Sequence, residues 1–244
     1  MDNKIVAILG MHRSGTSVLA NWLQQCGLFI GDDLMQGATG NEKGHFEDMD
    51  FVRFHESVLK EKGLPASGLC MHNVHTLPVE RIQEFKNIIT RKSSNHKSWA
   101  WKDPRTCLFL YPYRQLLPAA KYIVIVRNYK DCIFSLMERN LKNAEIKYLQ
   151  HASFIKKKWW QYYRKEKFRK EYFTNNTERH IKIWIKYNSE IVSHISKIEP
   201  ENYYVISYEN FAESTGMLYD KIKNYWHIPV SYINTEKIYK PARK

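Results

Sequence analysis

The feature that most constrains this 244-residue chain is an apolar run followed directly by a turn with two glycines. Residues 5–9 are all apolar, as in a strand buried on both faces of a parallel sheet, and residues 16–26 show helical spacing. Residues 10–17 join them with the sequence Gly-Met-His-Arg-Ser-Gly-Thr-Ser. In such a turn, backbone N–H groups and a helix N-terminus can hold an anion. The sequence therefore predicts an anion-binding turn in an α/β domain.

The turn departs from the ATP-binding consensus G-x-x-x-x-G-K-[ST] at its lysine. Thr16 takes that position, Ser17 keeps the hydroxyl, and the cation lies within the loop as Arg13. The apolar strand expected at residues 121–126 is followed by Arg127. A kinase or hydrolase needs an aspartate at such a strand end to hold Mg²⁺. We expect a site for an anion other than Mg-ATP. A P-loop kinase or hydrolase stays open as an alternative, and so does a glycine-bearing turn without a ligand.

The remaining chain alternates strands and helices, which predicts a P-loop-like three-layer α/β fold with a central parallel sheet flanked by helices. We expect one domain over residues 1–244, with a basic helical insert at about 140–177. The expected strands are 4–9, 98–101, 121–126 and 203–207. The expected helices are 16–26, 50–61, 79–91, 130–139, 178–198 and 211–226, with loops at 31–48 and 63–77.

Two segments resemble the donor-binding elements of sulfotransferases that use 3′-phosphoadenosine 5′-phosphosulfate (PAPS). Residues 12–17, His-Arg-Ser-Gly-Thr-Ser, resemble the loop that binds the 5′-phosphosulfate. Arg127 at a strand end, with Ser135 eight residues later, resembles the pair that binds the 3′-phosphate. The physical logic agrees, because an arginine offers a bidentate donor to a phosphate. Taken alone, Arg127 could equally form an ordinary ion pair. Ser135 could equally be a helix serine whose hydroxyl bonds back to the backbone.

Three further segments resemble this family more weakly. Residues 101–105, Trp-Lys-Asp-Pro-Arg, contain a lysine that approaches the transferring sulfuryl group in the family, and Tyr208 begins a Tyr-Glu-Asn-Phe element near the adenine. Residues 44–48, Gly-His-Phe-Glu-Asp, fall where related enzymes carry a glutamate base. The resemblance implies donor binding by Arg13, Ser14, Gly15, Thr16, Ser17, Arg127, Ser135 and Tyr208.

The resemblance also implies in-line sulfuryl transfer from PAPS to an acceptor hydroxyl or amine, without a metal. Arg13 and Lys102 would stabilise the sulfuryl oxygens and the leaving phosphate, and Glu47 would be the general base. His45 is the second candidate base and Asp48 the third. Alternatively, all three residues could simply belong to a polar loop that contains a helix cap. A glycan acceptor is slightly favoured, with peptides, lipids and small molecules still open. The family's glycine-rich C-terminal loop is absent, and residues 240–243 are its candidate replacement.

Composition narrows the possible partners. The net charge of +13 attracts anions: a nucleotide, an acidic glycan, nucleic acid or an anionic membrane. Four cysteines without a C-x-x-C pair or zinc spacing predict free thiols and no metal. No run of 18 apolar residues occurs and the start is a poor signal peptide, so we expect no membrane span and a cytoplasmic location.

Residues 156–170 combine eight Lys or Arg residues with several aromatic residues. A solvated amphipathic helix is the ordinary interpretation of this pattern. It could also shape the acceptor site or contact a membrane peripherally. A non-catalytic nucleic-acid-binding protein is a third functional class, but it leaves the two anion sites unexplained, so we expect no nucleic acid. The sequence does not indicate the oligomeric state.

Overall fold

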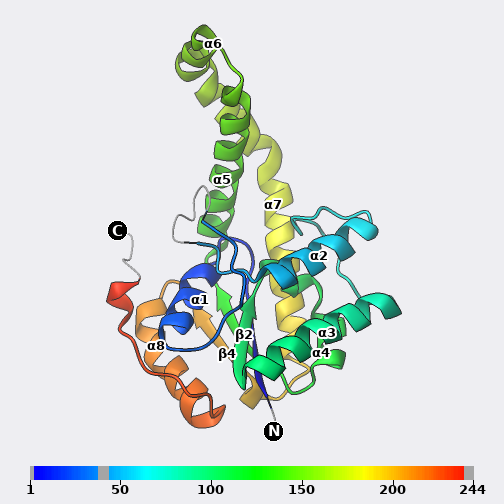
Figure 1. Ribbon diagram of the computed structural model, residues 1–244. Coiled ribbons are helices and arrows are strands. Elements are labelled where there is room, and N and C mark those ends of the chain that lie inside the picture. The colour runs from blue at the N-terminus through cyan, green and yellow to red at the C-terminus, as the bar shows by residue number, and fades with distance from the viewer. Residues whose placement is uncertain (1–2, 38–43, 239–244) are drawn as a thin grey trace.

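The computed structural model, which describes residues 3–37 and 44–238, contains a four-stranded parallel sheet (Figure 1). The strands are β1 (Lys4–Leu9), β2 (Ser98–Lys102), β3 (Lys121–Val126) and β4 (Tyr203–Ser207). They follow the order β2-β1-β3-β4, and each pair is parallel. The predicted α/β fold with a central parallel sheet is confirmed.

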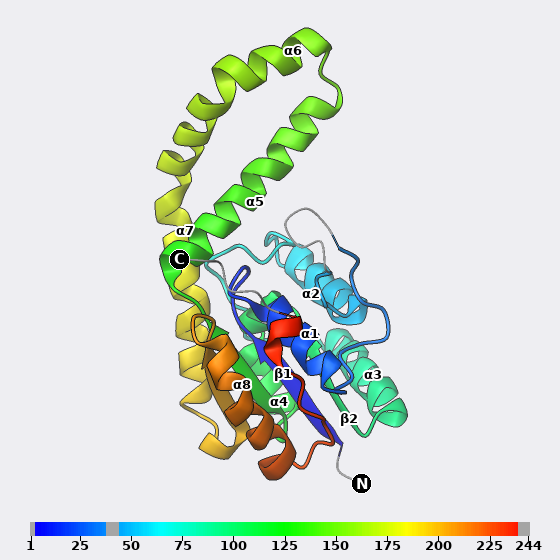
Figure 2. The same ribbon diagram turned by 90° about the vertical axis from the view of Figure 1, so that its left-hand side faces the viewer.

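Helices cover both faces of the sheet because its strands are apolar on both sides (Figure 2). Val6 and Ile8 of β1 face the layer formed by α1 and α8, whereas Ala7 and Leu9 face the other layer. The helices are α1 (Thr16–Gln25), α2 (Met49–Glu61), α3 (Val79–Asn95), α4 (Leu110–Leu116), α5 (Tyr129–Gln150), α6 (Phe154–Trp159), α7 (Lys165–Ile195) and α8 (Phe211–Asp220).

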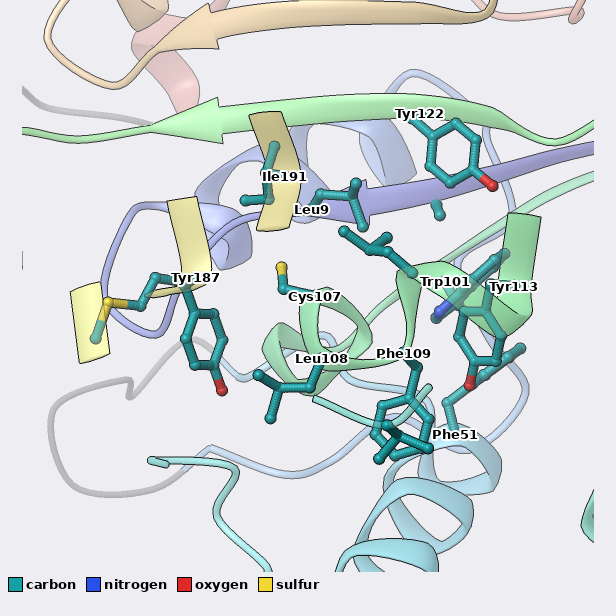
Figure 3. Close-up of a cluster of buried hydrophobic side chains, with 14 of the residues drawn as sticks. Leu9, Phe51, Trp101, Cys107, Leu108, Phe109, Tyr113, Tyr122, Tyr187 and Ile191 are labelled. Carbon is teal, nitrogen blue, oxygen red and sulfur yellow. The ribbon is translucent and has the colours of Figure 1, made fainter. Parts of the chain in front are cut away.

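The larger core cluster is rich in aromatic rings and lies between the sheet and the layer of α2, α3, α4 and α7 (Figure 3). Phe51 of α2 stacks on Trp101 of β2 with ring centroids 4.8 Å apart. Tyr113 of α4 stacks on Phe85 of α3 at 4.5 Å. Packing of this kind fixes the carboxyl end of β2, and with it the residues that follow.

The predicted helix at residues 130–139 was too short. In the structure α5 continues to Gln150, and α7 starts at Lys165 instead of residue 178. Together with α6 and a π-helical turn at Trp160–Arg164, they form an arm that extends away from the sheet (Figures 1 and 2). Residues 140–177 are therefore almost wholly helical.

The strand order creates a crevice where a ligand is expected. From β1 the chain reaches β2 on one side, and it later returns to β3 on the other side. In open parallel sheets, ligands bind beyond the carboxyl ends of the strands at such a switch point. Residues 10–15 after β1 and Arg127 after β3 lie at this point.

Two composition-based expectations can be compared with the structure. All four cysteines are buried free thiols, as predicted. Within residues 3–37 and 44–238, no helix combines the length and the apolar character needed to cross a bilayer.

Candidate functional site

A cavity of about 240 Å³ lies at the carboxyl ends of the strands. Residues from every strand–helix turn of the sheet reach it, and so does one residue from α5. Its lining is His12, Arg13, Gly15, Thr16, Ser17, Val18, His45, Glu47, Lys102, Pro104, Arg127, Arg139 and Tyr208. Four of these side chains are cations, and Glu47 is the one acidic side chain among the described residues of the lining. A lining of this charge suits an anion.

Two glycines allow the turn after β1 to close tightly. Gly15 precedes α1 with φ of +99°, and a Cβ there would lie 2.2 Å from the Tyr208 ring. A Cβ on Gly10 would lie 2.8 Å from the carbonyl oxygen of Ile125. Helix α1 begins at Thr16, so the N–H groups of its first turn lie at the cavity wall. This is the geometry of an anion-binding helix N-terminus.

The arginine after β3 is oriented by its neighbours. Its guanidinium lies over the Tyr208 ring, 4.5 Å from the centroid, and its Nη1 donates to the carbonyl oxygen of Arg13 at 3.1 Å. Arg127 Nε is buried, and within residues 3–37 and 44–238 it has no hydrogen-bond partner. A buried donor without an acceptor is costly unless a ligand supplies one. Arg127 therefore has an unused donor at the cavity.

Three arginines crowd the same side of the cavity. Arg13, whose φ is +69°, donates from Nε to Ser135 Oγ at 2.9 Å. Burial lowers the pKa of Arg13, and the charge of Arg127 lowers it further. Burial and the charge of Arg13 likewise lower the pKa of Arg139. Because these cations repel one another, an anion bound among them would relieve the repulsion.

Sequence reasoning missed Arg139. It lies on α5 four residues after Ser135, hence on the same face of that helix. Among the described residues it makes no hydrogen bond or ion pair, although it lines the cavity. The spacing from Ser135 is a signal that could have found it, but only once a helix at that point was certain.

The carboxylate of Glu47 is buried against a cation. Glu47 is 6% exposed and Lys102 is 1% exposed. Lys102 Nζ donates to Glu47 Oε1 at 2.7 Å, and Arg105 Nη1 lies 3.7 Å from Oε2. The pair brings the predicted base and the predicted sulfuryl-binding lysine together in one wall of the cavity.

Behind this wall lies a buried polar network. Arg105 donates to both oxygens of Asp103, and Asp103 Oδ2 also lies 2.8 Å from Nδ1 of His55. Nε2 of His55 lies 2.6 Å from the hydroxyl of Tyr113. Although burial alone would raise the pKa of Asp103, the charge of Arg105 and the contact with His55 hold it far below its ordinary value. These residues hold the 101–105 segment in place and do not line the cavity.

Two histidines of the lining, His45 and His12, have a lowered pKa. Burial lowers the pKa of His45, and the nearby carboxylate of Glu47 only partly opposes this effect. Burial and the charge of Arg139 hold the pKa of His12 well below its ordinary value. His12 Nε2 lies 3.0 Å from the carbonyl oxygen of Ser67, to which only an N–H can donate. The backbone of His45 also contributes, since its carbonyl oxygen accepts from Ser17 Oγ at 3.1 Å.

Most of the residues predicted for the site line the cavity, but Ser14, Ser135 and Asp48 do not. Ser14 is buried beneath the loop and donates to the Met11 carbonyl at 2.7 Å. Ser135 lies in an adjoining cavity rather than in this one. Asp48, the third candidate base, caps α2 and pairs with Lys92 at 2.5 Å, fully buried, so that prediction was wrong. The candidate lid at residues 240–243 lies outside the described residues.

The chain thus has a P-loop-like α/β fold with a cation-lined cavity at the carboxyl ends of its strands. The model of the Sulfotransferase family matches residues 6–231, so the chain belongs to the sulfotransferase family and is a sulfuryl-transferring enzyme. No curated protein matches it in sequence.

Two solved structures share the fold. The sulfotransferase domain from the curacin biosynthetic pathway is 14% identical, with 98% of this chain and 79% of that chain covered, at a TM-score of 0.52. The sulfotransferase from Alicyclobacillus acidocaldarius is also 14% identical, with 99% and 88% covered, at a TM-score of 0.54.

Proposed function

We propose that the enzyme takes its sulfuryl group from PAPS and that the cavity beside residues 10–17 receives the phosphosulfate. The observation that carries the proposal is the charge of the lining, where Arg13, Lys102, Arg127 and Arg139 face a single carboxylate. Thr16 replaces the lysine of ATP-binding loops, which argues against Mg-ATP as the ligand.

The size of the cavity supports binding of only the phosphosulfate end of PAPS within it. At about 240 Å³ it falls below the roughly 300–1,000 Å³ of common small-molecule pockets. It therefore suits the charged end of the donor, with the rest of the nucleotide beyond it. In this arrangement Tyr208 lies near the adenine, and the free Nε of Arg127, with Ser135, binds the 3′-phosphate. Ser14 supports the loop from beneath through its bond to Met11.

In the proposed reaction the acceptor oxygen attacks sulfur as the bond from sulfur to the phosphate oxygen breaks. Glu47 takes the proton of the acceptor hydroxyl. Lys102, which donates to Glu47, and Arg13 stabilise the charge that develops on the sulfuryl and phosphate oxygens. His45, neutral and in the same lining, is the second candidate base. These cations supply the charge compensation, so we propose a reaction without a metal.

A glycan is the acceptor class that we propose. An adjoining cavity of about 540 Å³ shares Arg13 and Arg139 with the donor cavity. Its wall alternates acidic and basic side chains, which can hydrogen-bond to the many hydroxyls of a sugar. They include Glu138, Lys142, Glu145, Lys165, Glu166 and Arg169. The cytoplasmic location and the single-domain organisation stay predictions of the sequence.

The test is transfer of ³⁵S from labelled PAPS to a panel of oligosaccharides, peptides and phenols in the presence of EDTA. We expect label in the oligosaccharides, lost in Arg13→Ala but kept in Arg179→Ala, which removes an exposed arginine of α7. Label in peptides or phenols alone would contradict the glycan proposal. Turnover that needs Mg-ATP would contradict the donor.

A further inference from the structure

The far end of the arm carries an unusual surface. We define the arm tip as residues 146–164, from the last turn of α5 through α6 to the π-helical turn. The arm tip contains five Lys or Arg residues and no Asp or Glu. Lys156, Lys157 and Lys158 are consecutive in α6, and all three are exposed. The tip is thus a concentrated positive charge.

Large apolar side chains are exposed among these cations. Ile155 is 79% exposed and Phe154 is 70% exposed. Exposed aromatic residues follow within the next turns: Trp159, Tyr162 and Tyr163. A contiguous group of this kind usually marks a site of interaction with a protein or a membrane.

The exposure results from a well-defined fold of the arm tip. Trp160 turns inward, packs on Tyr148 and Phe168, and donates from its indole nitrogen to Glu145 at 2.9 Å. Lys165 pairs with the same carboxylate at 3.0 Å. One tryptophan therefore anchors the turn, and the neighbouring aromatic residues are left facing outward.

The arm holds this surface away from the sheet and its helices. Helix α5 has 22 residues and is therefore about 33 Å long. In both views α6 lies at the extreme end of the arm (Figures 1 and 2). Nothing in the described part of the main body covers the tip, so a flat partner could reach it without a clash.

We propose that the arm tip docks on an anionic membrane surface. Exposed tryptophan and tyrosine suit the boundary between headgroups and acyl chains, and Phe154 and Ile155 suit the apolar layer below it. The lysines of α6 suit the negative potential of anionic headgroups.

The same observations disfavour two other partners. Single-stranded nucleic acid could stack its bases on the exposed aromatic faces, but it offers no apolar layer for Phe154 and Ile155, which are 70% and 79% exposed. A second copy of this chain would bring two acid-free, positively charged tips together, where like charges repel. An anionic lipid surface satisfies both the charge and the apolar side chains.

Docking would also set the distance between the active site and the membrane. Arg139 of the donor cavity lies about 17 Å of helix before Gln150 at the end of α5. The cavity would stand roughly 20 Å above the lipid, in reach of groups displayed on its surface.

The test is co-sedimentation of the full chain with vesicles of phosphatidylcholine alone or with about one third phosphatidylserine. We expect binding to the anionic vesicles only. The charge reversal Lys156→Glu, Lys157→Glu, Lys158→Glu should weaken it at least a hundredfold, since the loss of each lysine near such a surface alone costs roughly fivefold. Phe154→Ser with Ile155→Ser should also abolish stable binding.

Matched controls keep the net charge and the apolar content equal. Lys62→Glu, Lys86→Glu, Lys97→Glu reverses three exposed lysines of the main body, and Val79→Ser with Met217→Ser removes two exposed apolar side chains there. Both controls should bind like the wild type, and all variants should keep the melting temperature because the changed residues are exposed. Equal binding to neutral vesicles, no binding to anionic ones, equal losses in the controls, or binding of a single-stranded oligonucleotide in place of vesicles would overturn the proposal.

Discussion

Glu47→Gln removes the one charge that we assign to proton transfer and keeps the shape of the side chain. The amide oxygen can still accept from Lys102, now 2.7 Å from the carboxylate, but it cannot take a proton from the acceptor. Loss of a positioned general base typically lowers turnover by about 10²–10⁴-fold. We expect a decrease of that size in the acceptor-dependent release of adenosine 3′,5′-bisphosphate.

The same substitution has a predictable effect on stability and on binding. Complete loss of a buried ion-pair partner costs about 3–5 kcal/mol, but the retained acceptor should limit the cost to about 1–3 kcal/mol. For a chain of this size that lowers the melting temperature by about 2–12 °C. Adenosine 3′,5′-bisphosphate should bind at least as tightly as to the wild type, because a negative charge has left the cavity.

Glu56→Gln is the matched control. Glu56 accepts from Arg105 at 2.8 Å in the same network but does not line the cavity. This variant should keep turnover near the wild-type value. Near-normal turnover in Glu47→Gln would refute the assignment of the base. A parallel loss of binding and turnover in both variants would show that Glu47 acts only in the structure.

Three further predictions concern the loop, the missed arginine and acid stability. Gly15→Ala should abolish binding of adenosine 3′,5′-bisphosphate, measured by calorimetry, because its Cβ would lie 2.2 Å from a Tyr208 ring carbon. The control Gly216→Ala has open space around it and should stabilise α8 by about 0.5–1 kcal/mol. Arg139→Ala should weaken the same binding about 10–100-fold, and Arg139→Lys less, through loss of a charge-assisted hydrogen bond. Burial, with nearby cations, lowers the pKa of His194 to about 4. Since its unfolded pKa is about 6.5, the stability it contributes is present above pH 6.5 and lost as the pH falls towards 4. His194→Phe should therefore remove about 2–3 kcal/mol of the difference in urea-measured stability between pH 7 and pH 4.5.

Local pattern was sufficient to predict the sheet and the glycine-bearing turn after β1. Uninterrupted apolar runs mark strands buried on both faces, and the structure has β3 at Lys121–Val126 as predicted. The glycines of the turn are required by local geometry, so the sequence alone indicates their role. Because Arg127 and Tyr208 each follow a strand directly, their meeting at the carboxyl edge follows from the parallel topology.

The features that depend on long-range contact could not be predicted in this way. Arg139 reaches the cavity because α5 continues well beyond it, and α5 continues because it packs on α7, some forty residues later in the chain. The ion pair between Lys92 of α3 and Asp48, the N-cap of α2, rules out Asp48 as a base. It joins two residues that are distant in the sequence. No spacing rule connects such residues before the fold is known.

Binding of adenosine 3′,5′-bisphosphate is the measurement that tests the donor assignment most directly. Calorimetry with the purified chain in EDTA should show saturable binding of the bisphosphate, weakened about 10–100-fold in Arg127→Ala, which removes a charge-assisted donor. Binding should raise the melting temperature in proportion to affinity, and ATP should have little effect. Binding of Mg-ATP in preference to the bisphosphate, or no binding of either nucleotide, would contradict the account.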